Sequence, residues 1–488
     1  MSRAVPFLAR RCRLATRYAL AACAIALTGG CFMVGPDYQR PEVVAPAAFA
    51  HETAAAAATA DTTWWQQFQD PLLDQLILEG LAHNSDIAIA AANVDNLSAV
   101  LLQTRSQLFP QTGYNAGGQG QRGDVPTTVY NATLSASWEL DLWGRIRRQS
   151  ESAFANVLAS DEARRGVVLS LVATVANGYL QLCGLDAQLA IAQRTLGTYK
   201  DSVALFTLQF QYGQVSQMNV VQAQSQYETA AGQIPAIRSQ IAQIENSLAV
   251  LVGREPGPIT RGKSINELIL PPIPQGVPSE LLERRPDLLQ SEQQLIAANA
   301  QIGAAKALYF PKISLTGVFG TASSDLTELF KGPTRVWTYA GSLAGPIFTF
   351  GAISGQVAQA EAAQKAALLN YQLAIRNAFA DVDNALVANQ QLQLQLGAQV
   401  RLVAALKKYT DLANLQFIGG YTDYTTVLQA EQSLFPAELA LASLRAELLS
   451  SSVNTYKAMG GGWVTQADKL TTPEPQSPPT VAARPPLF

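Results

Sequence analysis

Apolar residues recur with a helical period over two long stretches that contain no proline, residues 142–218 and 348–434. In the first stretch the spacing alternates between four and three residues, as in the seam of a coiled coil. The positions are Val168, Val172, Val175, Tyr179 and Leu182, and adding 207 to the first four gives Ile375, Phe379, Val382 and Leu386. The pattern predicts helices over 144–212 and 351–418, each roughly 100 Å long at ~1.5 Å per residue. Glycines are expected to end these helices. A second helix then runs back after each turn, and Pro235 and Pro436 are expected to interrupt or kink these return helices.

Before each long helix the apolar period changes to two. The alternating positions are Tyr130, Ala132, Leu134, Ala136 and Trp138, then Ile313, Leu315, Gly317 and Phe319, then Trp337, Tyr339, Gly341 and Leu343. Small or hydroxyl-bearing residues lie between them, which is typical of transmembrane β-strands with lipid on one face and water on the other. Alternation also fits a half-buried soluble sheet. The length of ~10 residues and the aromatic ends favour the membrane interpretation.

The chain contains two copies of one unit. At an offset of 201, residues 84–87 match 285–288, and 108–110 match 309–311. At an offset of 207, residues 208–213 match 415–420, 222–223 match 429–430, and Gly253 matches Gly460. Two constant offsets over five landmarks indicate a duplication, with six extra residues between Pro311 and Gly351 in the second copy.

Each copy supplies one hairpin, so the chain has four predicted strands, too few to close a barrel in lipid. Three chains would give twelve, an even number within the range of outer-membrane barrels. We therefore predict a mainly α protein with a small transmembrane β portion. Its trimer would form a 12-stranded β-barrel continued by an α-helical barrel.

Residues 1–30 predict a lipoprotein signal peptide, with five arginines before a short apolar run. The run ends in Leu27-Thr28-Gly29-Gly30-Cys31, which resembles a lipobox with its leucine one residue early. We expect N-acyl and S-diacylglycerol groups on Cys31, while an ordinary signal peptide is the alternative. Apart from this covalent lipid no cofactor is expected. Cys183 is then the one unmodified cysteine of the mature chain, and we interpret it as a core residue.

The remaining composition narrows the function. Formal net charge is −3 with 15% charged residues, so no basic field for nucleic acid exists. The only histidines, His51 and His83, both lie near the N-terminus. A histidine-based metal site or catalytic triad is therefore not expected, and neither is an enzyme.

These features predict six segments. They are a signal peptide (1–30), an anchor and spacer (31–83), a first repeat (84–255), a linker (256–284), a second repeat (285–462) and a proline-rich disordered tail (463–488).

One motif is set aside. Residues 118–123 match G-x-G-x-x-G, but the following Asp124-Val125-Pro126 leads into a strand and not into the helix that a dinucleotide site requires. We interpret this segment as a flexible extracellular loop.

Three motifs are typical of a single family. They are Gly35-Pro36-Asp37-Tyr38-Gln39-Arg40-Pro41, Trp64-Trp65-Gln66-Gln67-Phe68-Gln69-Asp70-Pro71-Leu72 and Trp138-Glu139-Leu140-Asp141-Leu142-Trp143-Gly144. With these motifs the chain resembles the TolC-like outer membrane factors, specifically their lipoprotein branch, from Cys31 to about Gly462. The resemblance implies a homotrimer in outer-membrane lipid with a helical tunnel in the periplasm. It also implies docking to a periplasmic adaptor protein bound to an inner-membrane RND-type pump.

The family's periplasmic end is closed by polar contacts and narrowed by rings of aspartate. Counting from the turn glycines places the aspartates on Thr426 and Gln429, and the polar pair of the first turn on Asn219 and Gln222. This chain therefore departs from the acidic ring.

Other residues near this periplasmic end, the tip, are candidates for a constriction, namely Phe417, Tyr421, Asp423 and Tyr424. The alternative is that they cap and pack the turn. The candidate adaptor-docking turns contain Tyr212, Gly213, Gly419, Gly420 and Tyr421.

The predicted function is a passive exit duct for drugs or toxic small molecules, whose loss raises antibiotic sensitivity. The alternatives are an exit duct for a type I secreted protein or for metal ions, and a periplasmic lipoprotein scaffold or enzyme.

Overall fold

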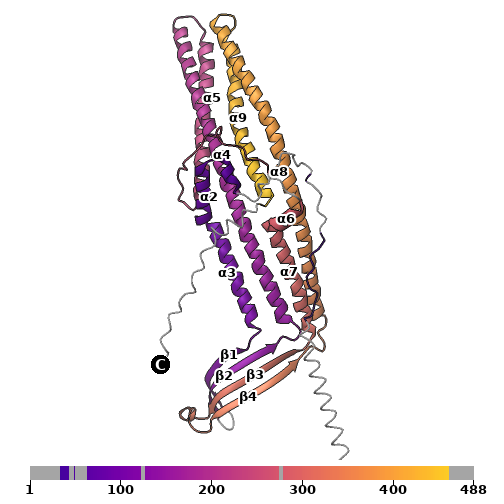
Figure 1. Ribbon diagram of the computed structural model, residues 1–488. Coiled ribbons are helices and arrows are strands. Elements are labelled where there is room, and N and C mark those ends of the chain that lie inside the picture. Colours follow the sequence, from indigo (N-terminus) through magenta and orange to yellow (C-terminus); the bar gives the residue numbers. More distant parts are fainter. Residues whose placement is uncertain (1–32, 43–48, 50–62, 123–126, 274–277, 461–488) are drawn as a thin grey trace, which may run out of the picture. The chain divides into compact units, whose positions relative to one another are not determined.

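The computed structural model describes residues 33–42, 49, 63–122, 127–273 and 278–460. The predicted signal peptide, Cys31 and the predicted tail at 463–488 lie outside these residues. In chain order the elements are η1 (Trp64–Phe68), α2 (Pro71–His83), α3 (Ser85–Ser106), β1 (Gln111–Gln121), β2 (Thr127–Leu140), α4 (Arg145–Gln211), α5 (Gln217–Leu251), α6 (Pro278–Arg284), α7 (Pro286–Lys306), η2 (Ala307–Tyr309), β3 (Lys312–Ser323), η3 (Leu326–Glu328), β4 (Arg335–Ala344), α8 (Ala352–Ile418) and α9 (Tyr424–Ala458) (Figure 1).

The order helix, hairpin, long helix, return helix occurs twice, first as α3, β1, β2, α4 and α5, then as α7, β3, β4, α8 and α9. The six extra residues of the second copy lie in its hairpin connection. Residues 324–334 join β3 to β4, whereas 122–126 join β1 to β2. The duplication is therefore structural, and the insertion is confined to a loop.

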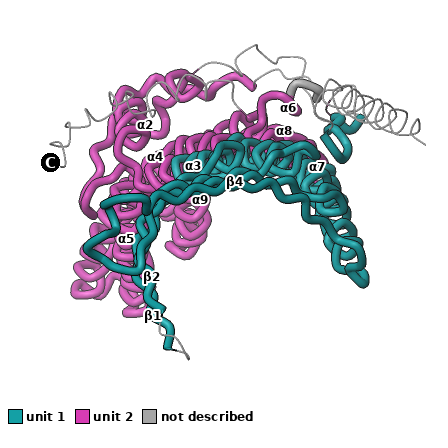
Figure 2. The backbone as a smooth tube through the Cα atoms, turned by 90° about the horizontal axis from the view of Figure 1, so that it is seen from below, with its two compact units in different colours: residues 1–42, 93–160, 290–372 teal, residues 43–92, 161–289, 373–488 magenta. Residues whose placement is uncertain are grey.

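The chain divides into two compact units that do not follow the two copies (Figure 2). Unit 1 contains residues 1–42, 93–160 and 290–372, and unit 2 contains 43–92, 161–289 and 373–488. Each unit therefore draws on both copies, and α3, α4, α7 and α8 contribute residues to both units.

The two long helices are confirmed. Helices α4 and α8 both contain 67 residues, which corresponds to roughly 100 Å at ~1.5 Å per residue. The predicted interruption of the return helices is wrong, because α5 and α9 run through Pro235 and Pro436. Each proline removes one backbone hydrogen bond of its helix, while the residues directly before them, Ile234 and Phe435, are buried.

All four strands form one antiparallel sheet in the order β1-β2-β3-β4 (Figure 1). In the first hairpin Gln111 lies opposite Ser137, and in the second Lys312 lies opposite Ala344. The offsets of 201 and 207 convert the first pair into the second. The two hairpins therefore have the same register, and the offsets can be used to move contacts from one copy to the other.

The register collects apolar side chains on one face of the sheet. Tyr114, Leu134, Phe319 and Trp337 form a row across all four strands, with exposed fractions of 86, 62, 60 and 68%. On the other face Glu139, Ser314 and Ser342 form a polar row. The predicted alternation is confirmed, and the described part of the chain leaves the large apolar side chains of this row exposed.

The loop predicted over 118–123 is wrong where the structure describes it. Gly118 to Gln121 belong to β1, and Gly118 lies opposite Tyr130. A Cβ at Gly118 would lie 2.8 Å from the Tyr130 ring, so the strand needs glycine there. Because glycines and glutamines show no apolar alternation, the sequence pattern did not reveal that the first strand extends through these residues.

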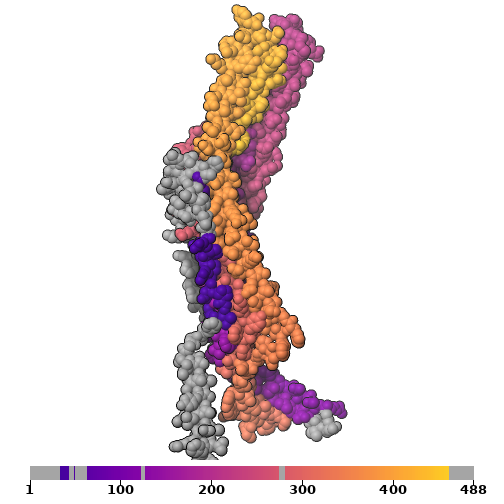
Figure 3. All heavy atoms as spheres, turned by 90° about the vertical axis from the view of Figure 1, so that its right-hand side faces the viewer, coloured from indigo at the N-terminus to yellow at the C-terminus, as the bar shows by residue number. Residues whose placement is uncertain are grey.

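The core of unit 2 lies along the predicted seam. Val168, Val172, Val175, Tyr179 and Leu182 are 0–1% exposed. Trp64 stacks on Tyr456 of α9 with 5.4 Å between ring centroids. Cys183 is buried among these residues, as predicted, and burial raises the pKa of its thiol to about 12. Helices α8 and α9, orange and yellow in Figure 3, also pack together in this unit, where the Gln399 side chain donates to the Ala437 carbonyl at 2.9 Å.

Fully buried Asp70 ties three segments of unit 2 together. Its carboxylate accepts from the backbone N–H of Leu72 and so caps α2, and it accepts from the Tyr179 hydroxyl at 2.6 Å. It also accepts from the backbone N–H of Lys263 at 3.0 Å. This carboxylate therefore joins the N-terminal segment, α4 and the linker between the copies.

Replacement of Asp70 by Ala is expected to destabilise unit 2 by about 2–4 kcal/mol, because it removes the cap and leaves two buried donors unpaired. Tyr179→Phe removes one of the hydrogen bonds to Asp70 and also the one that the hydroxyl accepts from the Gly262 N–H, and it is expected to cost about 1–2 kcal/mol. The melting temperatures of the purified variants in detergent measure both effects. Equal melting temperatures for Asp70→Ala and the parent would contradict the proposed tie.

Candidate functional site

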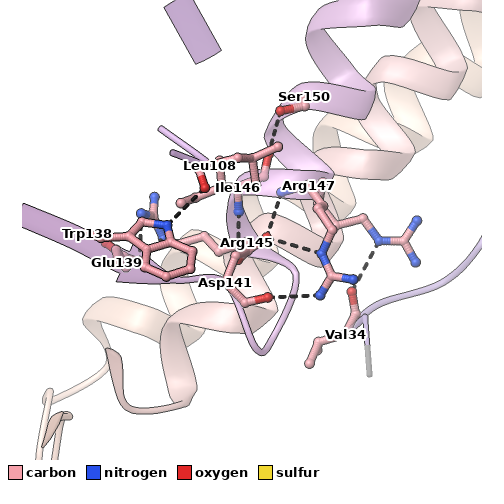
Figure 4. Close-up of polar contacts among 10 residues, drawn as sticks. Val34, Leu108, Trp138, Glu139, Asp141, Arg145, Ile146, Arg147 and Ser150 are labelled. Carbon is pink, nitrogen blue, oxygen red and sulfur yellow. Dashed lines mark hydrogen bonds and ion pairs between the residues drawn. The ribbon is translucent and has the colours of Figure 1, made fainter. Parts of the chain in front are cut away.

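Asp141 caps the N-terminus of α4 in unit 1, where the chain passes from the sheet into this helix (Figure 4). Its carboxylate accepts from the backbone N–H groups of Ile146 at 3.0 Å and Arg147 at 2.9 Å. Negative charge at a helix N-terminus is favourable, because the first N–H groups there have no partner within the helix. The Trp138 indole donates to the Leu108 carbonyl at 2.9 Å and so fixes the end of β2. These contacts therefore fix the short connection between the end of β2 and the start of α4.

An aromatic stack joins the two copies at this junction. The Trp143 ring lies 4.6 Å from the Phe310 ring at an interplanar angle of 24°. The Trp143 indole also donates to the Pro311 carbonyl at 2.8 Å. Trp143, which follows the first hairpin, thus contacts Phe310 and Pro311, which precede the second.

The N-terminal segment is fixed onto unit 1 from Val34 onward. The Val34 N–H donates to the Trp143 carbonyl at 3.1 Å. The buried Arg148 guanidinium donates to the Asp37 carboxylate at 2.7 Å, and Arg40 pairs with Glu292 at 2.9 Å. The contacts of this N-terminal segment therefore begin beside the junction of sheet and helix, at Val34, three positions after Cys31 in the sequence.

The candidate docking turns of unit 2 have the same backbone geometry. Gly213 and Gly420 are left-handed, with φ of 72° and 73°. The N–H of the following residue closes each helix end, Gln214 on the Gln209 carbonyl and Tyr421 on the Gln416 carbonyl. These are Schellman ends, for which glycine is favoured because it accepts positive φ without strain.

The turns carry two exposed aromatic side chains. Tyr212 is 75% exposed and Tyr421 is 88% exposed, while Gly419 lies beside the Tyr421 ring. The structure therefore leaves these predicted docking residues accessible, and their binding role stays a prediction.

The candidate gate residues fall into two groups. Phe417 and Tyr424 join Phe206 in an aromatic cluster, in which the Phe206 and Tyr424 centroids are 4.1 Å apart. Tyr424 is buried in this cluster, so it packs α4 against α9. A constriction would form between subunits, so the predicted role of Tyr424 in one stays a prediction.

The polar gate candidates lie at the starts of the return helices. Asp423 and Gln429 are exposed, whereas Asn219, Gln222 and Thr426 are half-buried. Asn219 accepts from the Ser216 hydroxyl at 2.9 Å, and Thr426 lies 2.7 Å from the Thr422 hydroxyl. These two contacts are local to each turn. Whether these residues hold the tip closed stays a prediction.

A model of the family described as outer membrane efflux protein matches residues 76–254 and 277–461. The chain belongs to this family. The match spans both copies, including the strands, both long helices and both turns.

Curated relatives match over nearly the whole chain. The probable efflux pump outer membrane protein TtgC of Pseudomonas putida is 37% identical over 459 residues, covering 90% of this chain and 94% of that protein. The cation efflux system protein CusC of Escherichia coli is 35% identical over 450 residues, covering 90% and 97%. The chain is thus an outer-membrane efflux component.

A solved relative has the same fold. The open state of the Neisseria gonorrhoeae MtrE outer membrane channel matches with a TM-score of 0.81 and 33% identity. The match covers 89% of this chain and 99% of that chain. The exposed apolar row of the sheet is therefore found in a protein with the fold of an outer-membrane channel.

The efflux protein also contains a buried carboxyl group that sequence reasoning missed. Glu431 of α9 is 9% exposed, and its Oε2 atom has no hydrogen-bond partner among the described residues. It lines a cavity of about 330 Å³ with Tyr199 and Asp411. Glu438, on the same cavity, is paired with Arg194 at 2.7 Å and with Lys407 at 3.0 Å. Only the tertiary packing of α4, α8 and α9 distinguishes these two glutamates.

Alanine in place of Gly213 or Gly420 is expected to destabilise the tip by about 1 kcal/mol, because a side chain is strained at positive φ. No atom lies within 4 Å of a Cβ at either position, so strain is the only cost within the chain. Gly197 of α4 is the matched control, since it is a helical glycine with equal space, and Gly197→Ala is expected to stabilise. Hydrogen exchange of the tip measures the effect, and equal protection in all three variants would contradict it.

Stability of the helical tip is expected to fall as pH rises from about 4.5 to about 7. Burial raises the pKa of Glu431 from 4.5 to about 7, so the folded state holds a proton that the unfolded state has already lost. Stability decreases with pH wherever the folded state binds more protons. Glu431→Gln is expected to flatten this dependence and to stabilise the tip above pH 7.

Hydrogen exchange of α9 as a function of pH provides the measurement. Glu438→Gln is the control, because it removes the charge from a paired glutamate and is expected to destabilise the tip. An unchanged pH dependence in Glu431→Gln would contradict the assignment.

Proposed function

We propose that three copies of this efflux protein form one duct through the outer membrane and periplasm. The supporting observation is the four-stranded sheet. Among the described residues, β1 and β4 each pair with one strand only, while one face carries exposed apolar side chains. Backbone groups at open edges cannot remain unpaired in lipid, so strands must be added until the sheet closes. Three copies supply twelve strands, with the polar face inside and the apolar face in lipid.

The proposed duct is passive. Long helices α4 and α8 with return helices α5 and α9 would line up in three copies as a periplasmic tube. A periplasmic adaptor would contact the exposed turns at Tyr212 and Tyr421, and an inner-membrane pump would supply the energy. Three copies of exposed Asp423 would place negative charge at the mouth, since like charges in a ring add their potentials.

We further propose that Cys31 carries the lipid anchor. Val34 follows it by three positions in the sequence, and the Val34 N–H donates to the Trp143 carbonyl. Three extended residues reach at most ~10 Å. The acyl chains would therefore enter the bilayer beside the end of β2. Cys31→Ser is the variant that removes the attachment site.

We propose drugs and other toxic organic molecules as the exported substrates. Deletion of the gene is expected to raise sensitivity across a panel of antibiotics, detergents and dyes. Metal salts in the same panel test metal-ion export as the alternative, which the match to the cation efflux relative favours. Sensitivity to metal salts alone would overturn the drug proposal.

An arginine at Leu134 is expected to reduce recovery of the protein in the outer membrane. On the lipid face such a charge costs ~2–4 kcal/mol near the bilayer midplane. Ser135→Arg, on the opposite face of the same strand, is the matched control and is expected to change conductance without loss of insertion. Membrane fractionation and planar-bilayer recording measure the two effects. Equal insertion of both variants, or recovery of the parent as a monomer, would overturn the proposed barrel.

A further inference from the structure

Two aromatic side chains near the sheet edges in unit 1 have little or no cover from the described residues of the chain. Phe350, between β4 and α8, is fully exposed and adopts φ of 46°. Phe109, just before β1, is 66% exposed. A bulky residue in the left-handed region is strained, and such strain persists only where other contacts compensate for it.

The duplication identifies what these residues match. Phe350 is the equivalent of Trp143 at the offset of 207, and Phe109 is the equivalent of Phe310 at the offset of 201. Trp143 and Phe310 are the two rings that stack at 4.6 Å where the copies meet inside the chain. Phe350 and Phe109 are thus the equivalents of two residues that stack on each other, yet both of these rings are exposed.

The strand register can be moved in the same way. Within the chain Ser137 of β2 lies opposite Thr316 of β3. The offsets convert these residues into Ala344 of β4 and Asn115 of β1, which lie on the two sheet edges. The same conversion reproduces the observed register of the second hairpin from that of the first. The transferred register also keeps the apolar face continuous, whereas a slip of one residue would reverse it.

We propose that Phe350 of one subunit stacks on Phe109 of the partner subunit and holds β4 against β1 with Ala344 opposite Asn115 of the partner subunit. The stack would relieve the exposure of both rings and set the register at the base of the barrel. The partner is a second molecule of this protein, because the Trp143–Phe310 stack between the two internal repeats is the template for the contact. This inference rests on the proposed trimer and adds the residues that define its interface.

Paired cysteines test the register in the full-length protein in membranes. Ala344→Cys with Asn115→Cys is expected to give covalent dimers and trimers on oxidation. Ala344→Cys with Gly117→Cys is the slipped control, two residues along the same face, and is expected to give little product. The single variants and the parent, which retains buried Cys183, measure the background.

An amine-reactive cross-linker applied to the same membranes separates the two levels of failure. Trimers with this reagent but efficient disulfides only in the slipped pair, or in neither pair, would overturn the register and leave the trimer intact. Monomers with both reagents would overturn the trimer itself.

Alanine substitution tests the stack. Phe350→Ala is expected to lower the temperature at which the detergent-resistant trimer dissociates, and Phe350→Trp is expected to restore it. Phe348→Ala is the matched control, since Phe348 is 83% exposed on the same loop but is equivalent to Asp141, which is not part of the stack. Equal effects of Phe348→Ala and Phe350→Ala would mean that both rings serve as a general lipid anchor, which would overturn the stack.

Discussion

The structure depends on one constraint, that backbone hydrogen-bonding groups must be paired where no water can reach them. A sheet of four strands satisfies this constraint between its strands and leaves it unsatisfied at β1 and β4. The apolar row across the sheet removes the alternative of a solvated surface. The trimer proposed above would pair these two strands, and it would place the helices that follow each hairpin in the same symmetric arrangement.

Duplication supplies the geometry for this assembly. The two hairpins have equivalent registers, and the extra residues of the second copy lie in its loop. Differences between the copies appear where their surroundings differ. Trp143 is covered by Phe310, whereas its equivalent Phe350 is exposed. Such differences between equivalent positions indicate surfaces that a further copy would cover.

Polar side chains fix the alignment of the N-terminal region against the long helix, which apolar packing alone specifies less strictly. The buried side chains of Asp70 in unit 2 and Arg148 in unit 1 both bind the N-terminal region to α4, Asp70 through the Tyr179 hydroxyl and Arg148 through the Val34 carbonyl. Buried polar groups are costly unless they are paired, so each bond selects one alignment of its segments. Glu431 is the exception, because its Oε2 atom has no hydrogen-bond partner among the described residues and burial raises the pKa of this carboxyl group.

The sequence by itself determined the duplication, the long helices, the alternation of β2, β3 and β4 and the glycine turns. Each follows from local periodicity or from the backbone preference of one residue type. Tertiary structure alone decided that Gly118 belongs to a strand, that Pro235 does not break its helix and that Tyr424 packs inside the tip. These outcomes depend on neighbours far away in the chain. Glu438 is paired, whereas Glu431 Oε2 has no hydrogen-bond partner within the part of the chain that the structure describes. This difference depends on three helices at once, which no local sequence pattern records.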